Sequence, residues 1–436
     1  MRRATPLVLA LLTLAPSAFA QSAPVELTLA EALRRGREDP PAVRTALARA
    51  AATEAQIDQA RAGYYPTVTT SGTASMGFSD QPVLSNVRYQ SVTAGLGANV
   101  TARIPIYDFG RTSNNVEAAT RSGSAAREDL RAARLSAMAS VAAAYLTVLS
   151  DQEVINAARA TITQREAHLR IAEGLVAAGA RPPIERTRAV VDLDVGRLDL
   201  TTAEARERND RATLAAALGI DPLRDVTLTA VEDEALRADD DPARAAAAAV
   251  ANRAEFAAAR MRLSQAEAQA SVARSGRLPT LSAQASGAVN YSERITGQGA
   301  FGVSEQLQGS VTLSWPIFDP SVNANVRIAD ANVSTARETL AQQSLQVRSA
   351  AVQAAINLRA AAVTLDQSEH LATSAAANLE QANGRYQSGA AALLELVDAQ
   401  AADASARYAV IRARLSLQIA RVNLLAATGE LGRLAR

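Results

Sequence analysis

The sequence predicts a mainly α-helical protein with transmembrane β-strands, built from two copies of one structural unit. Three observations lead to this fold class. The second half of the chain repeats motifs of the first half in the same order. Each half contains stretches in which apolar and polar residues alternate, which is typical of strands with one apolar face. Each half also contains an uninterrupted helical pattern far longer than a globular domain requires.

The internal repeat keeps its register through a whole half of the chain. Pro66-Thr67 recurs 213 residues later as Pro279-Thr280, the motif that ends in Asp108 recurs 211 residues later at Asp319, and Gly179 recurs 210 residues later as Gly389. Repeats of short solenoids have periods of 20 to 50 residues. We therefore expect one large unit copied once, with repeats at 21–230 and 231–436.

The N-terminus predicts export from the cytoplasm. Arg2 and Arg3 precede an apolar stretch from Leu7 to Leu14, and Ala18-Phe19-Ala20 supplies a small-residue cleavage site. We interpret residues 1–20 as a signal peptide, because a membrane anchor needs about 20 apolar residues. The chain contains no cysteine, which excludes disulfides and thiolate metal sites.

Composition argues against several classes of function. A formal net charge of +1 gives no reason to expect nucleic acid as a partner. No phosphate-binding glycine loop or nucleophile motif is present, so we expect neither an enzyme nor a cofactor. His168 and His370 do not align between the two repeats, and we expect both on solvated helix faces rather than in a metal site.

The first repeat begins with a helix and a strand pair. Thr28 and Glu31 form a capping box, and a helical pattern continues to about Ala62, interrupted at Pro40-Pro41. A strand pair follows at about 65–106, and in its second strand the apolar residues fall on one face: Val92, Ala94, Leu96, Ala98, Val100, Ala102, Ile104 and Ile106. The second repeat has the same order, with a helix at 243–275 and a strand pair at about 279–317.

Long amphipathic strands of this kind match those of outer-membrane barrels, although a soluble half-buried sheet has the same periodicity. The aromatic residues favour the membrane, because ten of the 15 lie in or beside the strands, as interfacial girdles require. Four strands cannot close a barrel in lipid, where every backbone amide must be paired. The chain must therefore oligomerise if it spans a membrane.

Each strand pair precedes a helical stretch of roughly 70 residues, which corresponds to ~105 Å at 1.5 Å per residue. The two stretches are 108–178 and 319–388, and apolar residues spaced by three and four predict coiled-coil seams in both. A turn that contains Gly179 or Gly389 then reverses the chain into a shorter returning helix, 184–219 in the first repeat and 391–428 in the second.

The duplicated plan, the segment 385–400 (RYQSGAAALLELVDAQ) and the segment 315–319 (WPIFD) resemble the TolC family of outer-membrane efflux channels over the whole mature chain. This resemblance implies a homotrimer in the outer membrane. Its strands would form one 12-stranded β-barrel in outer-membrane lipid, and its helices a long periplasmic α-barrel. It also implies a periplasmic adaptor and an inner-membrane pump of the RND or ABC type as partners, and drugs, metals or other solutes as cargo.

The resemblance assigns roles to particular residues. Glu395 and Asp398 match a carboxylate ring that narrows the periplasmic entrance, and Gly179, Ala180, Tyr386, Gly389 and Ala390 match the tip that docks the adaptor. Two departures concern the same region. Ala391 stands where some relatives have a basic residue that helps to lock the closed tip, and Pro182-Pro183 is a double proline that the family does not usually have.

Two alternatives remain open at this stage. The same channel could serve type I protein secretion, and operon neighbours would distinguish that role better than any residue. From a different class, the chain could be a soluble periplasmic coiled-coil scaffold, which predicts extraction without detergent.

Overall fold

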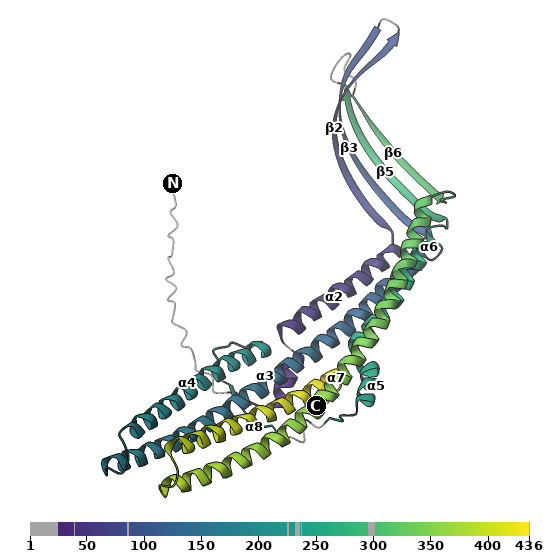
Figure 1. Ribbon diagram of the computed structural model, residues 1–436. Helices are drawn as coiled ribbons and strands as arrows, with labels where there is room; N and C mark the ends of the chain where they lie inside the picture. Colours follow the sequence, from purple (N-terminus) through teal and green to yellow (C-terminus); the bar gives the residue numbers. More distant parts are fainter. Residues whose placement is uncertain are drawn as a thin grey trace, which may run out of the picture.

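The computed structural model describes residues 25–38, 40–84, 87–224, 226–231, 236, 238–294 and 301–435. The expected signal peptide, 1–20, lies outside these residues. Four long strands extend from one end of a helical body, and two helical hairpins form its opposite end (Figure 1). The predicted combination of long helices and four antiparallel strands is confirmed.

The first helix of each repeat is broken at the same place. In the first repeat, α1 (Leu29–Glu38) and α2 (Pro41–Arg61) are separated at Pro40, which is extended. The helix expected at 243–275 is likewise two helices, α5 (Pro242–Asn252) and α6 (Ala254–Ser275), and the expectation of one continuous helix was wrong. The residue between them, Arg253, has φ −72° and ψ 124°. Its guanidinium donates to the carbonyl of Ala426 and to Glu255, and these bonds fix the bend without a proline.

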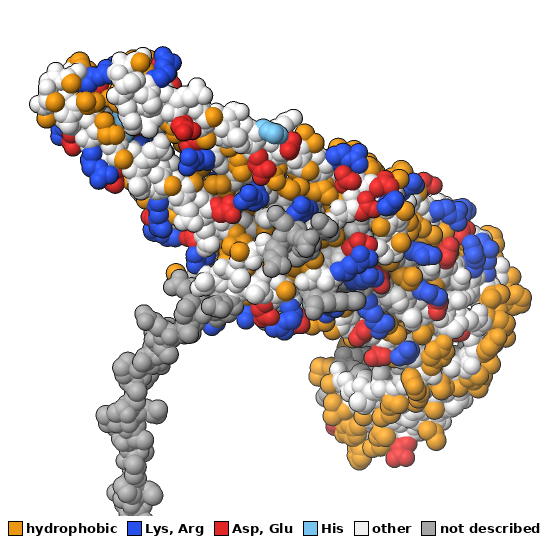
Figure 2. Space-filling model, turned by 90° about the horizontal axis from the view of Figure 1, so that it is seen from below, with side chains coloured by type: hydrophobic (Ala, Val, Ile, Leu, Met, Phe, Trp, Pro, Cys, Tyr) orange, Lys and Arg blue, Asp and Glu red, His pale blue; other side chains and the backbone are white. Residues whose placement is uncertain are grey.

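The strands form one antiparallel sheet in the order β2 (Thr67–Leu84), β3 (Val87–Tyr107), β5 (Thr280–Arg294) and β6 (Phe301–Ser314). Because β3 pairs with β5, the sheet joins the two repeats. The apolar face predicted from the alternation is uncovered, with Leu307 90% and Leu96 61% exposed. In Figure 2 hydrophobic side chains follow the convex outer side of the curved sheet, and its concave side is largely white. A contiguous uncovered apolar face of this kind marks a surface that contacts a membrane or another protein.

The long helices are α3 (Arg111–Ala177) and α7 (Pro320–Gln387), and the returning helices are α4 (Ile184–Leu218) and α8 (Leu393–Ala427). Asp319 caps α7 by accepting from the Ser321 N–H at 2.8 Å, and Asp108 accepts from the Thr112 N–H at the start of α3. α3 contains an 18-residue window of mean hydropathy 1.5. Only 33% of this window is buried within the single chain. Along its whole length α3 packs against α1, α2, α4, α6 and α8.

A short parallel strand pair, β1 (Val25–Leu27) and β4 (Val226–Leu228), lies against the middle of α3 and was not predicted from the sequence. Tyr145 of α3 is fully buried beside it. The Tyr145 hydroxyl lies 2.8 Å from the Leu27 carbonyl oxygen and 2.7 Å from that of Thr229, and it accepts from the Thr229 N–H. This hydroxyl therefore ties both short strands to the long helix.

Replacement of Tyr145 by phenylalanine should destabilise the protein by about 0.5–1.5 kcal/mol, the usual net contribution of a hydrogen bond. The Leu27 and Thr229 carbonyls both lose the hydroxyl, and the Leu27 oxygen keeps only the Thr229 N–H. The midpoint of thermal loss of helical circular dichroism in detergent measures this effect. Tyr65→Phe, at a tyrosine that is 68% exposed, is the matched control and should leave the midpoint unchanged. Equal midpoints for the two variants would show that the hydroxyl does not hold the strands.

Candidate functional site

The two hairpin turns at the end of the helical body have the same backbone conformation. Gly179 and Gly389 have φ values of 70° and 76°, in the left-handed region that glycine adopts without strain. The Ala180 N–H donates to the Leu175 carbonyl at 2.9 Å, and the Ala390 N–H donates to the Arg385 carbonyl at 2.8 Å. These bonds form Schellman motifs at the C-terminal ends of α3 and α7. All four turn residues are exposed, as a docking surface requires.

Tyr386 was expected among the docking residues, but its side chain is only 2% exposed. Its hydroxyl donates to Glu185 Oε2 of α4 at 3.1 Å. Arg181 lies 5.3 Å from the centre of the Tyr386 ring and pairs with Glu185 at 3.5 Å. The structure therefore places Tyr386 between the two hairpins, where it links the tip of one repeat to the tip of the other.

His168 also belongs to this buried cluster, and the expectation of a solvated helix face was wrong for it. The residue is 5% exposed and its ring lies 5.6 Å from that of Tyr386. Burial lowers the pKa of His168, although the carboxylates of Asp192 and Glu185 oppose this effect, so the neutral imidazole is favoured. His370, in contrast, is exposed as expected, with 82% of its side chain accessible.

Arg165 lies on the same face of α3 as His168 and joins this helix to α4. It is 9% exposed, and its guanidinium donates to the backbone carbonyl of Asp192 at 2.8 Å. A Cβ atom at Gly196 would lie 2.9 Å from Arg165 Nη1, so glycine at this position of α4 leaves the space that the guanidinium fills. The buried polar residues near the tip thus hold α3 to α4 as well as the two repeats to each other.

The two carboxylates proposed for the gate have different surroundings. Glu395 pairs with Arg385 at 2.7 Å, across the turn between α7 and α8. Asp398 is exposed and has no hydrogen-bond or ion-pair partner among the residues that the structure describes. Both lie in the first two turns of α8, where carboxylates are favoured by the helix dipole. Among the described residues, Asp398 is thus the gate carboxylate whose charge no partner offsets.

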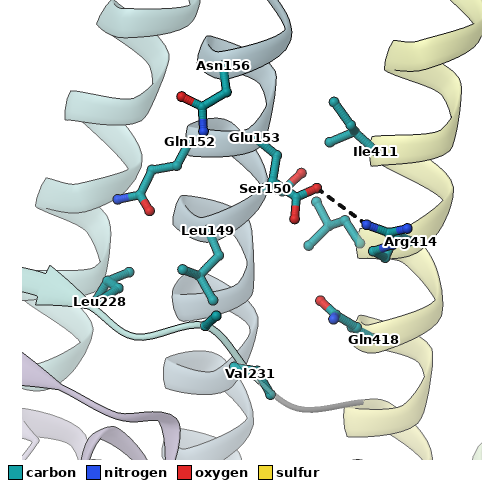
Figure 3. Close-up of a pocket in the computed structure, with 12 residues that line it drawn as sticks. Leu149, Ser150, Gln152, Glu153, Asn156, Leu228, Val231, Ile411, Arg414 and Gln418 are labelled. Carbon is teal, nitrogen blue, oxygen red and sulfur yellow. Dashed lines mark ion pairs between the residues drawn. The ribbon is translucent and has the colours of Figure 1, made fainter.

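An open groove of about 410 Å³ lies higher in the helical body, between α3 and α8 (Figure 3). Glu153 Oε2 and Arg414 Nη1 face each other across it at 4.0 Å. The remaining lining is mainly Leu, Ile, Val, Gln and Asn side chains. This arrangement offers no set of converging catalytic groups, and among the described residues no three His, Asp or Glu side chains are grouped to bind a metal.

Comparison with known proteins gives a consistent result. The family model described as "Outer membrane efflux protein" matches residues 33–220 and 246–430, one match in each repeat. The chain is 28% identical over 423 residues to Protein CyaE of Bordetella pertussis, covering 94% of this chain and 85% of that protein. It is also 28% identical to Outer membrane protein OprJ of Pseudomonas aeruginosa, covering 75% and 68%.

Solved structures have the same fold. The outer-membrane channel OprN superposes with a TM-score of 0.74 at 25% identity, covering 92% of this chain and 89% of that chain. The open-state MtrE outer membrane channel of Neisseria gonorrhoeae gives a TM-score of 0.72 at 21% identity, covering 94% and 90%. A soluble scaffold does not account for these matches together with the uncovered apolar sheet. The chain belongs to the outer membrane efflux protein family, whose members are channels rather than enzymes, and it is an outer-membrane efflux channel with a periplasmic helical portion.

Proposed function

We propose that three copies of this chain form the exit duct of a tripartite efflux system. The duct passively conducts drugs, metals or other solutes that an inner-membrane pump and a periplasmic adaptor pass on. This proposal rests on two features of the sheet. Its edge strands, β2 and β6, have no partner beyond the sheet in the described chain, and its apolar face is uncovered.

Oligomerisation follows from the membrane environment. Unpaired backbone groups of an edge strand cost several kcal/mol each in lipid, so the edges must pair with other copies. Pairing of β2 of one copy with β6 of the next is a head-to-tail contact, and such contacts form a ring when the rotation between copies closes. Three copies would supply 12 strands, the number that the family resemblance implies.

The proposed partners would bind at the tips of the two helical hairpins. Gly179, Ala180, Gly389 and Ala390 form two exposed turns of small residues, and small residues let another helical hairpin approach closely. We propose that a periplasmic adaptor docks there and connects the channel to an inner-membrane pump of the RND or ABC type.

The first experiment measures the mass and conductance of detergent-extracted protein from outer membranes. A heat-sensitive trimer that forms pores in planar bilayers supports the proposal. A water-soluble monomer or dimer without conductance would overturn it.

We expect the two proposed gate carboxylates to control the cation preference of the channel. Replacing both Glu395 and Asp398 by alanine should raise open conductance and reduce cation preference, because rings of carboxylates attract cations. Asp398→Asn alone should lower the preference more than Glu395→Gln alone, since Arg385 already offsets Glu395. Reversal potentials in a salt gradient measure the preference, with Glu267→Gln on α6 as a control far from the tip. Unchanged selectivity in all gate variants would contradict the assignment.

A further inference from the structure

The polar face of the sheet is almost free of charge. One row across the four strands is fixed by the strand register, in which Thr67 pairs with Arg103, Arg103 with Gln284, and Gln284 with Ser310. Because side chains alternate along a strand, every second residue from this row lies on the same face. Described side chains on that face are mainly Ser, Thr, Asn, Gln and Gly.

Charged residues of the sheet are divided by sign between its two faces. Among the described side chains of strand residues 67–80, 90–107, 280–294 and 301–314, the three acids share the register of the apolar face: Asp80, Glu293 and Glu305. Arg103 and Arg294 share the register of the polar face. Within these ranges, the polar face therefore has a positive charge and no carboxylate.

Arg103 lies near the end of the sheet that meets the helices. It is four residues before the last residue of β3, which corresponds to ~13 Å at about 3.3 Å per residue. Its direct neighbours across the sheet are Thr67 and Gln284, and its diagonal neighbours are Thr69, Ser282 and Ser286. All five are uncharged and Arg103 is exposed, so nothing beside it on this face offsets its charge.

We propose that Arg103 is a selectivity residue that favours anionic solutes at the helical end of the barrel. This inference rests on the proposed trimer, in which the apolar face meets lipid and the polar face lines the lumen. Three copies of Arg103 would then form a positive ring in a narrow channel, where low-dielectric walls concentrate the potential of fixed charges. The ring is opposite in sign to Asp398, so cargo would meet a negative ring at the periplasmic tip and a positive ring at the helical end of the barrel.

The absence of cysteine from the chain permits a direct test. Ser286→Cys places a thiol on the polar face, diagonal to Arg103, and Ala285→Cys places one on the apolar face at the next position. Trimers in lipid vesicles are treated from the barrel side with an anionic and a cationic methanethiosulfonate. This measurement does not require the periplasmic tip to be open.

In Ser286→Cys, we compare the ratio of the anionic to the cationic labelling rate with and without the added substitution Arg103→Gln. The ratio should be on the order of three- to ten-fold higher when Arg103 is present, because the thiol and the guanidinium lie about one Debye length apart. Arg103→Lys should keep the high ratio, and Gln284→Ala, an uncharged change beside Arg103, should not alter it. In Ser286→Cys with Arg103 unchanged, the ratio should fall as the salt concentration is raised. This measurement does not depend on the folding of any arginine variant.

The labelling rates distinguish a barrel without the selectivity role of Arg103 from a sheet that forms no barrel. Rapid labelling of the thiol in Ser286→Cys, with a ratio that neither Arg103→Gln nor salt changes, would overturn the selectivity role and leave the barrel intact. Equal labelling of Ala285→Cys and Ser286→Cys in vesicles would contradict the barrel itself, and with it the proposed function.

Discussion

Replacement of Gly389 by leucine is expected to abolish efflux while the channel still assembles in the outer membrane. Gly389 has a φ of 76°, and a residue with a Cβ atom in this region costs roughly 1–2 kcal/mol. Apart from the adjacent residues, no heavy atom lies within 4 Å of a Cβ built at this position, so the added Cβ meets no other part of the fold. It would instead project from the exposed turn that we propose as the adaptor surface.

Two controls separate bulk from backbone strain. Gly389→Ala has the strained φ without a large side chain and should retain most of the efflux. Gly432→Leu adds the same bulk near the C-terminus, also where a Cβ meets nothing within 4 Å, and should retain all of it. Efflux is measured as drug accumulation in a strain that lacks its own channel, and assembly as the heat-sensitive trimer on gels. Normal efflux with Gly389→Leu would exclude this turn as the docking surface.

The strands and long helices could be predicted from the sequence because their periodic patterns continue over many residues. Eight alternating residues from Val92 to Ile106 identify a strand face regardless of its surroundings. The internal repeat also locates the helix break in the second half of the chain. The 213-residue shift places Arg253 opposite Pro40, so the break between α5 and α6 could have been predicted from the break between α1 and α2. β1 and β4 contain three residues each, too few to give a periodic pattern.

The contacts at the tip could not be predicted, because periodicity identifies helices but not which faces of different helices meet. Tyr386 and Glu185 are 201 residues apart in the chain. Alanine at position 391 put a salt-bridge lock through that position in doubt, and in the structure the Ala391 side chain is buried. Arg181, from the turn of the first repeat, supplies a cation to Tyr386 and Glu185. The double proline that follows it, Pro182-Pro183, lies directly before α4 and restricts the backbone of this turn.

Tyr386→Phe should open the periplasmic tip. The hydrogen bond from its hydroxyl to the Glu185 carboxylate joins the hairpins of the two repeats at a buried position. A bond to a charged acceptor contributes about 1.5–3 kcal/mol, so its loss should raise the population of separated tips by about ten- to one-hundred-fold. Single-channel recordings should show larger or more frequent openings, and cells should become sensitive to large antibiotics that the outer membrane normally excludes.

Glu185→Gln tests the same contact from the other side, because the amide is a weaker acceptor and loses the ion pair with Arg181. If the effect comes from this one hydrogen bond, the double variant should open the tip little more than the stronger single variant. The free-energy effects of substitutions at two contacting residues are not additive. Tyr107→Phe, at an exposed tyrosine of the barrel strands, is the matched control and should conduct as the unmodified channel does. Fully additive effects would mean that Tyr386 and Glu185 hold the tip through separate contacts. Unchanged conductance in both single variants would mean that this buried link does not hold the two hairpins together.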